Sequence, residues 1–149
     1  MSADIALVAR RFIRASAERV FAAWTEPDHL RQWWGPRPVT CCDASVDLRV
    51  GGGYRIGNLL PDGKVVWIAG AFEVVEPPKR LVYSWALDGK DHSRVTVRFE
   101  PKGDGTEVIV VHERIADEAT RDDHEKGWAG CLDGLERHFL SAQQRKPIE

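Results

Sequence analysis

The sequence predicts an α+β fold in which a curved antiparallel β-sheet of six to seven strands wraps around a long C-terminal helix, with two short helices after the first strand. Three observations predict it. The apolar residues follow helical spacing over residues 16–36, alternate with a period of two from about residue 39 to 114, and return to helical spacing beyond residue 117. A sheet and a helix with one apolar stripe pack most economically as two layers.

Length and composition describe an ordinary globular protein with one domain over residues 1–149. Charged residues make up 30% of the chain and hydrophobic residues 43%. The net charge of −2 comes from interspersed acids and bases, so no basic surface for nucleic acid is expected. No apolar run approaches the ~20 residues of a membrane span. We therefore expect neither a nucleic-acid nor a membrane partner.

The first strand and the first helix are predicted near the N-terminus. The segment DIALVARRFI is apolar and β-branched enough for a strand, and Ser16 then offers a helix N-cap. One apolar face of the helix that follows is formed by Val20, Phe21 and Trp24.

The second helix lies in the segment WTEPDHLRQWWGP, which holds three of the six tryptophans of the chain. Thr25 is the predicted cap, Pro27 suits a first turn, and Gly35-Pro36 ends the helix. We expect Trp33 to pack inward and Trp34 to lie near the junction with the sheet, at the mouth of a cavity. Plain core packing of both rings is the alternative.

The strands are separated by turn sequences, namely VGGG at 50–53, PDGK at 61–64, EPPK at 76–79, DGKD at 88–91 and KGDG at 102–105. Strands this close in sequence form an antiparallel meander. Alternation predicts three sets of residues that each share one face: Leu81, Tyr83 and Trp85; Val95, Val97 and Phe99; Val108, Val110 and His112.

The long C-terminal helix begins after Asp117, its predicted N-cap. Its apolar stripe is predicted from the spacing of His124, Trp128, Leu132, Leu135 and Phe139. Glycine is a poor helix former, so we expect close packing against the sheet at Gly127, Gly130 and Gly134.

Four segments in this order resemble the START-like (SRPBCC) helix-grip superfamily, whose fold is also called Bet v 1/START-like. They are FIRASAERVFAAWTEPDHLRQWWGP, DLRVGGGYRI, VVEPPKRLVYSWAL and VHERIADEATRDDHEKGWAGCLDGLERHF. More narrowly, they resemble the branch named after the activator of heat-shock protein 90 ATPase, over about residues 8–140. Arg14 and Ser16 depart from the acid and proline usual in that branch, which affects only the helix cap.

The resemblance implies a deep, largely apolar cavity between the sheet and the long helix, which relatives use for hydrophobic molecules. We therefore expect a small soluble domain that binds a hydrophobic small molecule. An aromatic inward face suits such a ligand with one or two polar groups. A solid aromatic core without room for a ligand is the alternative. The candidate ligand-binding residues are Trp34, Tyr54, Trp67, Tyr83, Trp85, His112 and Trp128.

His112 is the most informative polar candidate, because it continues an apolar inward series and a buried imidazole needs a partner. Tyr83 or His124 is the expected hydrogen-bond partner of His112. A second hypothesis follows, in which the protein is a cyclase-like or hydrolase-like enzyme with His112 as acid–base residue. It fails if packing seals His112. A third hypothesis is a chaperone-interaction domain, for which we expect no effect in an ATPase assay.

The remaining signals are weak. The vicinal pair Cys41-Cys42 with the distant Cys131 is a poor disulfide framework, which favours a reducing compartment. No signal peptide is recognised in MSADIALVARRFI, so we expect a cytoplasmic protein. The sequence has neither metal-ligand spacing nor a nucleotide fingerprint, and no metal or cofactor is expected. The sequence does not decide whether the protein forms a homodimer through a sheet edge or through Trp34.

Overall fold

The computed structural model describes residues 5–35 and 37–144, and these contain one antiparallel sheet with the strand order β1-β7-β6-β5-β4-β3-β2. The strands are β1 (Ile5–Ile13), β2 (Thr40–Val46), β3 (Gly53–Leu59), β4 (Val65–Glu76), β5 (Arg80–Leu87), β6 (Lys90–Lys102) and β7 (Gly105–Ile115). From β2 to β7, each strand pairs with the next one in the sequence, and β1 pairs with β7 at one edge of the sheet. The predicted meander is confirmed.

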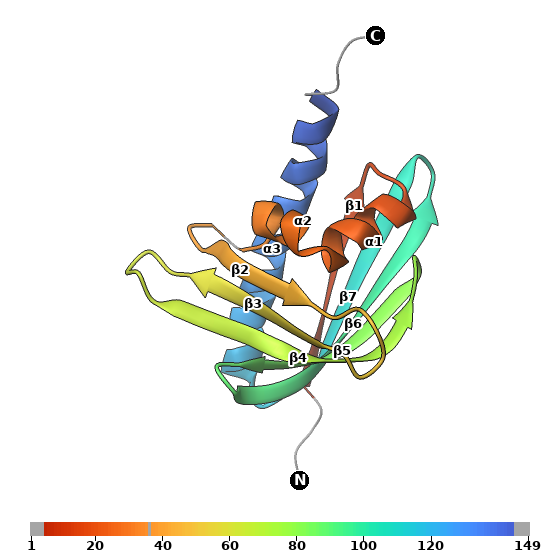
Figure 1. The fold of residues 1–149 in the computed structure, drawn as a ribbon. Coiled ribbons are helices and arrows are strands. Elements are labelled where there is room, and N and C mark those ends of the chain that lie inside the picture. The colour runs from red at the N-terminus through yellow and green to blue at the C-terminus, as the bar shows by residue number, and fades with distance from the viewer. Residues whose placement is uncertain (1–4, 36, 145–149) are drawn as a thin grey trace.

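Three helices accompany this sheet: α1 (Ala17–Thr25), α2 (Pro27–Trp33) and α3 (Glu118–Gln144). Figure 1 shows the curved sheet around the long α3, with α1 and α2 between the two ends of the sheet. Helix α3 packs against β1, β7 and α2, and α2 packs against β2. This is the predicted helix-grip architecture. Among the described residues, no helix is long and apolar enough to cross a membrane.

The first helix begins as predicted, and the second begins one residue later than predicted. The Ser16 hydroxyl accepts a hydrogen bond from the Arg19 backbone N–H at 3.2 Å. The predicted cap at Thr25 is wrong, because Thr25 is the last residue of α1. Its hydroxyl donates to the Phe21 carbonyl at 2.9 Å, so Glu26 takes the N-cap position of α2. Pro36 lies outside the described residues.

The inner face of the sheet carries the apolar residues that alternation predicts. In β5, β6 and β7, all nine residues predicted to face inward are at most 5% exposed. Their burial follows from strand geometry, because successive side chains point to opposite faces. The core therefore lies between this face and the three helices.

Helix α3 begins as predicted and presents the predicted stripe. The Asp117 carboxylate accepts a hydrogen bond from the Thr120 backbone N–H at 2.7 Å, and this bond lowers the pKa of Asp117. The stripe residues from Trp128 to Phe139 are at most 5% exposed, while His124 is half-buried.

Gly127 and Gly134 of α3 do not pack against the sheet as predicted, and the prediction for Gly130 stays a prediction. At Gly134 a Cβ would collide with the Trp33 carbonyl oxygen, so this glycine permits the approach of α2 rather than of a strand. At Gly127 a Cβ would meet no atom within 4 Å. The two glycines therefore have different roles, and Gly127 borders open space.

Candidate functional site

A cavity of about 360 Å³ lies between the inner face of the sheet and α3. Its volume falls in the range of small-molecule sites, roughly 300–1,000 Å³. Strands β3, β4 and β5 form one wall, α3 forms the opposite wall, and the segment after α2 closes one side. The lining residues are Trp34, Val39, Asn58, Leu60, Val66, Ile68, Trp85, Leu87, Thr120, Asp123, His124, Gly127, Trp128 and Cys131.

Three of the predicted site residues meet in this lining: Trp34, Trp85 and Trp128. Their ring centroids lie 5.5 Å apart for Trp85 and Trp128, 5.6 Å for Trp34 and Trp128, and 6.3 Å for Trp34 and Trp85. Each of the three indoles is therefore in aromatic contact with the other two. The cavity thus has an aromatic wall built from three distant parts of the chain.

Trp34 owes its direction to the end of α2. It is the C-cap residue, and its extended backbone (φ −68°, ψ 138°) turns the side chain out of the helical path. The indole N–H donates to the Asn58 side-chain oxygen at 3.0 Å, and the Asn58 amide in turn donates to the Val66 carbonyl at 3.4 Å. Asn58, which no pattern in the sequence indicates, therefore fixes Trp34 at the border of the cavity.

Trp85 carries a polar group that the described chain leaves unsatisfied. Its indole nitrogen is buried and meets no hydrogen-bond acceptor of the described residues. Leaving a buried donor unpaired costs about 1–3 kcal/mol. The nitrogen has almost no exposed surface, so this donor lies behind the cavity wall and out of reach of a ligand.

One end of the cavity is polar, and it lies at the start of α3. Thr120, Asp123 and His124 line this end, while the rest of the lining is aliphatic or aromatic apart from Asn58, Gly127 and Cys131. Gly127 adds room because it has no side chain, and a Cβ there would meet open space. The cavity is therefore mainly apolar, with one polar end, and is called the apolar cavity below.

Tyr54 and Tyr83 lie close to Trp34 and Trp85 but outside this lining. They border a void of about 20 Å³, enough for about one water molecule. The Tyr54 hydroxyl donates to the Ser84 carbonyl at 2.7 Å, and the Tyr83 hydroxyl accepts from the Trp24 indole at 3.3 Å. Burial raises the pKa of both phenols, so both stay protonated at neutral pH.

His112 is sealed beneath the aromatic wall, with 0% of its surface exposed. Its Nδ1 accepts a hydrogen bond from the Trp128 indole at 3.1 Å, so Nε2 carries the proton and donates to the Ser93 hydroxyl at 2.7 Å. Burial, together with the nearby His124, lowers the pKa of His112 to about 3, which keeps the ring neutral. The predicted hydrogen-bond partners Tyr83 and His124 are therefore wrong, because Ser93 and Trp128 bind the ring. His124 instead stacks on the His112 ring, with 4.7 Å between the ring centroids.

Trp67 lies on the opposite face of the sheet, so its prediction as a cavity residue is wrong. It is paired across the strands with Gly57, whereas its neighbour Ile68 faces inward opposite Ile56. The Arg55 guanidinium stacks on the indole of Trp67, with its Cζ 4.2 Å from the ring centroid. The missing side chain at Gly57 leaves room for the indole on this outer face.

The comparisons with known proteins identify the family. The family model described as "Activator of Hsp90 ATPase homolog 1-like protein" matches residues 14–139. The chain belongs to this family. No curated protein sequence matches the chain.

Solved structures of other proteins support the fold of this AHSA1-like chain. A protein from Chromobacterium violaceum is 26% identical with a TM-score of 0.83, over 90% of this chain and 96% of that chain. An AHSA1-like protein from Aeromonas hydrophila is 26% identical with a TM-score of 0.81, over 97% and 99% of the two chains. CalU16 from Micromonospora echinospora is 27% identical with a TM-score of 0.72, over 94% and 79%.

The described residues of the AHSA1-like chain include no group of three or more His, Cys, Asp or Glu side chains placed to hold a metal ion. The three cysteines differ in environment. Cys42 is exposed, Cys41 is half-buried with its pKa raised by burial, and Cys131 is buried beside the cavity. Burial raises the pKa of the Cys131 thiol to about 12, so this thiol acts as an apolar group.

Proposed function

We propose that the protein binds one hydrophobic small molecule, carrying one polar substituent, in the cavity between α3 and the sheet. The observation that carries this proposal is the 360 Å³ cavity bordered by Trp34, Trp85 and Trp128. The cavity opens to solvent beside the exposed Asp123, and a concave, mainly apolar pocket of this size is the usual kind of small-molecule site.

The shape and chemistry of the cavity narrow the class of ligand. Three indoles in mutual contact favour a ligand with a flat ring, because aromatic rings stack or meet edge to face. A polar substituent is accommodated at the end formed by Asp123 and His124.

The enzyme hypothesis has less support, because its proposed base is out of reach. His112 has no exposed surface, and both of its ring nitrogens are engaged in hydrogen bonds. A general base must come within hydrogen-bond distance of the proton that it removes. Binding without His112 chemistry is therefore the function we favour.

The binding proposal is tested with the neutral fluorophore N-phenyl-1-naphthylamine and a variant that fills the cavity. We expect saturable 1:1 binding, with quenching of tryptophan fluorescence. Gly127→Leu places a side chain in the open space beside the cavity and should weaken binding at least tenfold. Gly127→Ala is the matched control, because it removes the same glycine but adds only one methyl group, and it should bind almost as the wild type does.

Two results would overturn the proposal. One is the lack of saturable binding of the fluorophore by the wild type. The other is equal affinity of the wild type and Gly127→Leu, because binding would then take place away from Gly127.

A further inference from the structure

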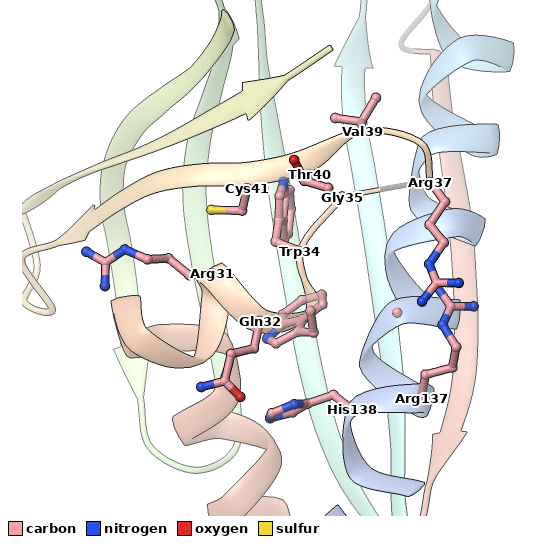
Figure 2. A pocket seen from close by; sticks show the side chains of 12 residues that line it. Arg31, Gln32, Trp34, Gly35, Arg37, Val39, Thr40, Cys41, Arg137 and His138 are labelled. Atoms are coloured by element: carbon pink, nitrogen blue, oxygen red, sulfur yellow. The ribbon is translucent and has the colours of Figure 1, made fainter. Parts of the chain in front are cut away.

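A second cavity, of about 520 Å³, lies between α2, the segment that leads to β2, and α3. Figure 2 shows its lining, which is strongly polar on the side of α3. Arg31, Arg37, Arg137 and His138 contribute to it, and none of the described residues that line it is acidic. This cavity also borders Trp34, but its chemistry is the opposite of the apolar cavity described above.

One of the three arginines is already neutralised within the protein. The Arg31 guanidinium donates to the Asp28 carboxylate at 2.6 Å, and its other terminal nitrogen lies 3.9 Å from the Asp43 carboxylate. Arg31 also points away from the other two arginines in Figure 2. The uncompensated positive charge of the cavity therefore comes from Arg37 and Arg137.

Arg37 and Arg137 reach the cavity from different elements. Figure 2 shows their guanidinium groups pointing toward one another, Arg37 from the segment after α2 and Arg137 from α3. Within the described part of the chain, neither guanidinium has a hydrogen bond or an ion pair with an acid. The acids of α3 nearest in sequence, Asp133 and Glu136, bind Arg11 of β1 instead, at 2.6 and 3.0 Å.

We propose that Arg37 and Arg137 form a binding site for an oxyanionic group, a phosphate or a carboxylate, carried by a small molecule. Two converging like charges repel each other, and an anion between them removes this repulsion. Each guanidinium offers a planar fork of N–H donors that matches two oxygens of such a group. The cavity is large enough to hold further atoms of the same molecule. This site does not depend on ligand binding in the apolar cavity.

The test is a titration of the ¹⁵N-labelled full-length protein with inorganic phosphate and, separately, with acetate, at constant ionic strength set by chloride. We expect saturable shifts of the backbone amides around the cavity, at residues 31–35 and 134–138. Arg37→Gln and Arg137→Gln should each weaken binding about tenfold, because each removes charge-assisted hydrogen bonds. Arg137→Lys keeps the charge without the fork and should give an intermediate loss.

Lys126→Gln is the matched control, since it removes one positive charge from the same helix at an exposed position outside the cavity. It should leave the affinity unchanged. Both glutamine variants alter exposed side chains without partners in the described structure, so their spectra should show an intact fold. Tighter binding of phosphate identifies a phosphate group as the preferred anion, and tighter binding of acetate identifies a carboxylate.

The proposal is overturned if neither anion causes saturable shifts at the cavity. It is equally overturned if Lys126→Gln weakens binding as much as Arg137→Gln does, because the effect would then reflect net charge alone. Unchanged affinity in both arginine variants would also refute it.

Discussion

Two glycines of α3 allow the packing around the cavity to be tested with one and the same substitution. Gly127 and Gly134 lie two helical turns apart, but an added methyl group meets open space at Gly127 and the Trp33 carbonyl at Gly134. We predict opposite effects of the two alanine substitutions on stability. Gly127→Ala should stabilise the protein, and Gly134→Ala should destabilise it.

The magnitudes follow from helix propensity and from steric contact. Alanine is favoured over glycine inside a helix by about 0.8–1.0 kcal/mol, and Gly127→Ala should gain this amount in full. At Gly134 the same gain is offset by overpacking, which costs about 1–3 kcal/mol because α2 must move away from α3. The two variants should therefore differ by about 1–3 kcal/mol in the free energy of unfolding.

Urea unfolding followed by tryptophan fluorescence measures both changes, provided that the m-values remain equal. For a chain of this length, a gain of about 1 kcal/mol corresponds to a rise in Tm of roughly 2–4 °C. A loss of stability in Gly127→Ala would refute the open space at this position. A gain in Gly134→Ala equal to that in Gly127→Ala would refute the close contact between α2 and α3.

Three further predictions concern buried groups around the cavity. Because burial lowers the pKa of His112 to about 3 from 6.5, its neutral ring stabilises the fold fully above pH 6.5 and loses this effect as the pH falls toward 3, by about 1.4 kcal/mol per pH unit. Urea unfolding between pH 6.5 and 4.5 gives the slope of the free energy of unfolding against pH, and His112→Asn should lower this slope. Equal slopes in the wild type and His112→Asn would contradict the buried, neutral state of His112. Trp128→Phe removes an indole N–H that binds His112, whereas Trp85→Phe removes an unpaired one, so Trp128→Phe should cost about 1–3 kcal/mol more stability. Equal losses would speak against the unpaired state of Trp85. Iodoacetamide at pH 8 should label the exposed Cys42 and spare the buried Cys131, as mass spectrometry of the peptides can show; equal labelling would disprove the burial of Cys131.

The fold could be predicted from the sequence because each element carries its own period. Alternation in β5, β6 and β7 and the stripe from Trp128 to Phe139 both place apolar residues on one face, and burial follows directly. The cap at Ser16 was predictable for the same local reason. The error at Thr25 shows the limit of such reasoning, because a threonine can bind its own helix as readily as the next one.

The candidate site was only partly predictable. Trp34, Trp85 and Trp128 border the apolar cavity as expected. Trp67 was assigned to the wrong face of β4, because its direction follows only from the pairing of β4 with β3, in which Trp67 lies opposite Gly57. His112 shares the predicted inward face, yet only the packing of Trp128 over it shows that it is sealed. The facing guanidiniums come from segments 100 residues apart, and no periodicity in the sequence indicates that they meet.

The most direct test of ligand binding is an NMR measurement of intermolecular NOEs between N-phenyl-1-naphthylamine and the protein. Binding in the cavity between α3 and the sheet predicts NOEs from the fluorophore to the indole protons of Trp34, Trp85 and Trp128. NOEs to the exposed Val8 and Phe12 of β1, with none to the three indoles, would contradict it, because the fluorophore would then bind the outer surface.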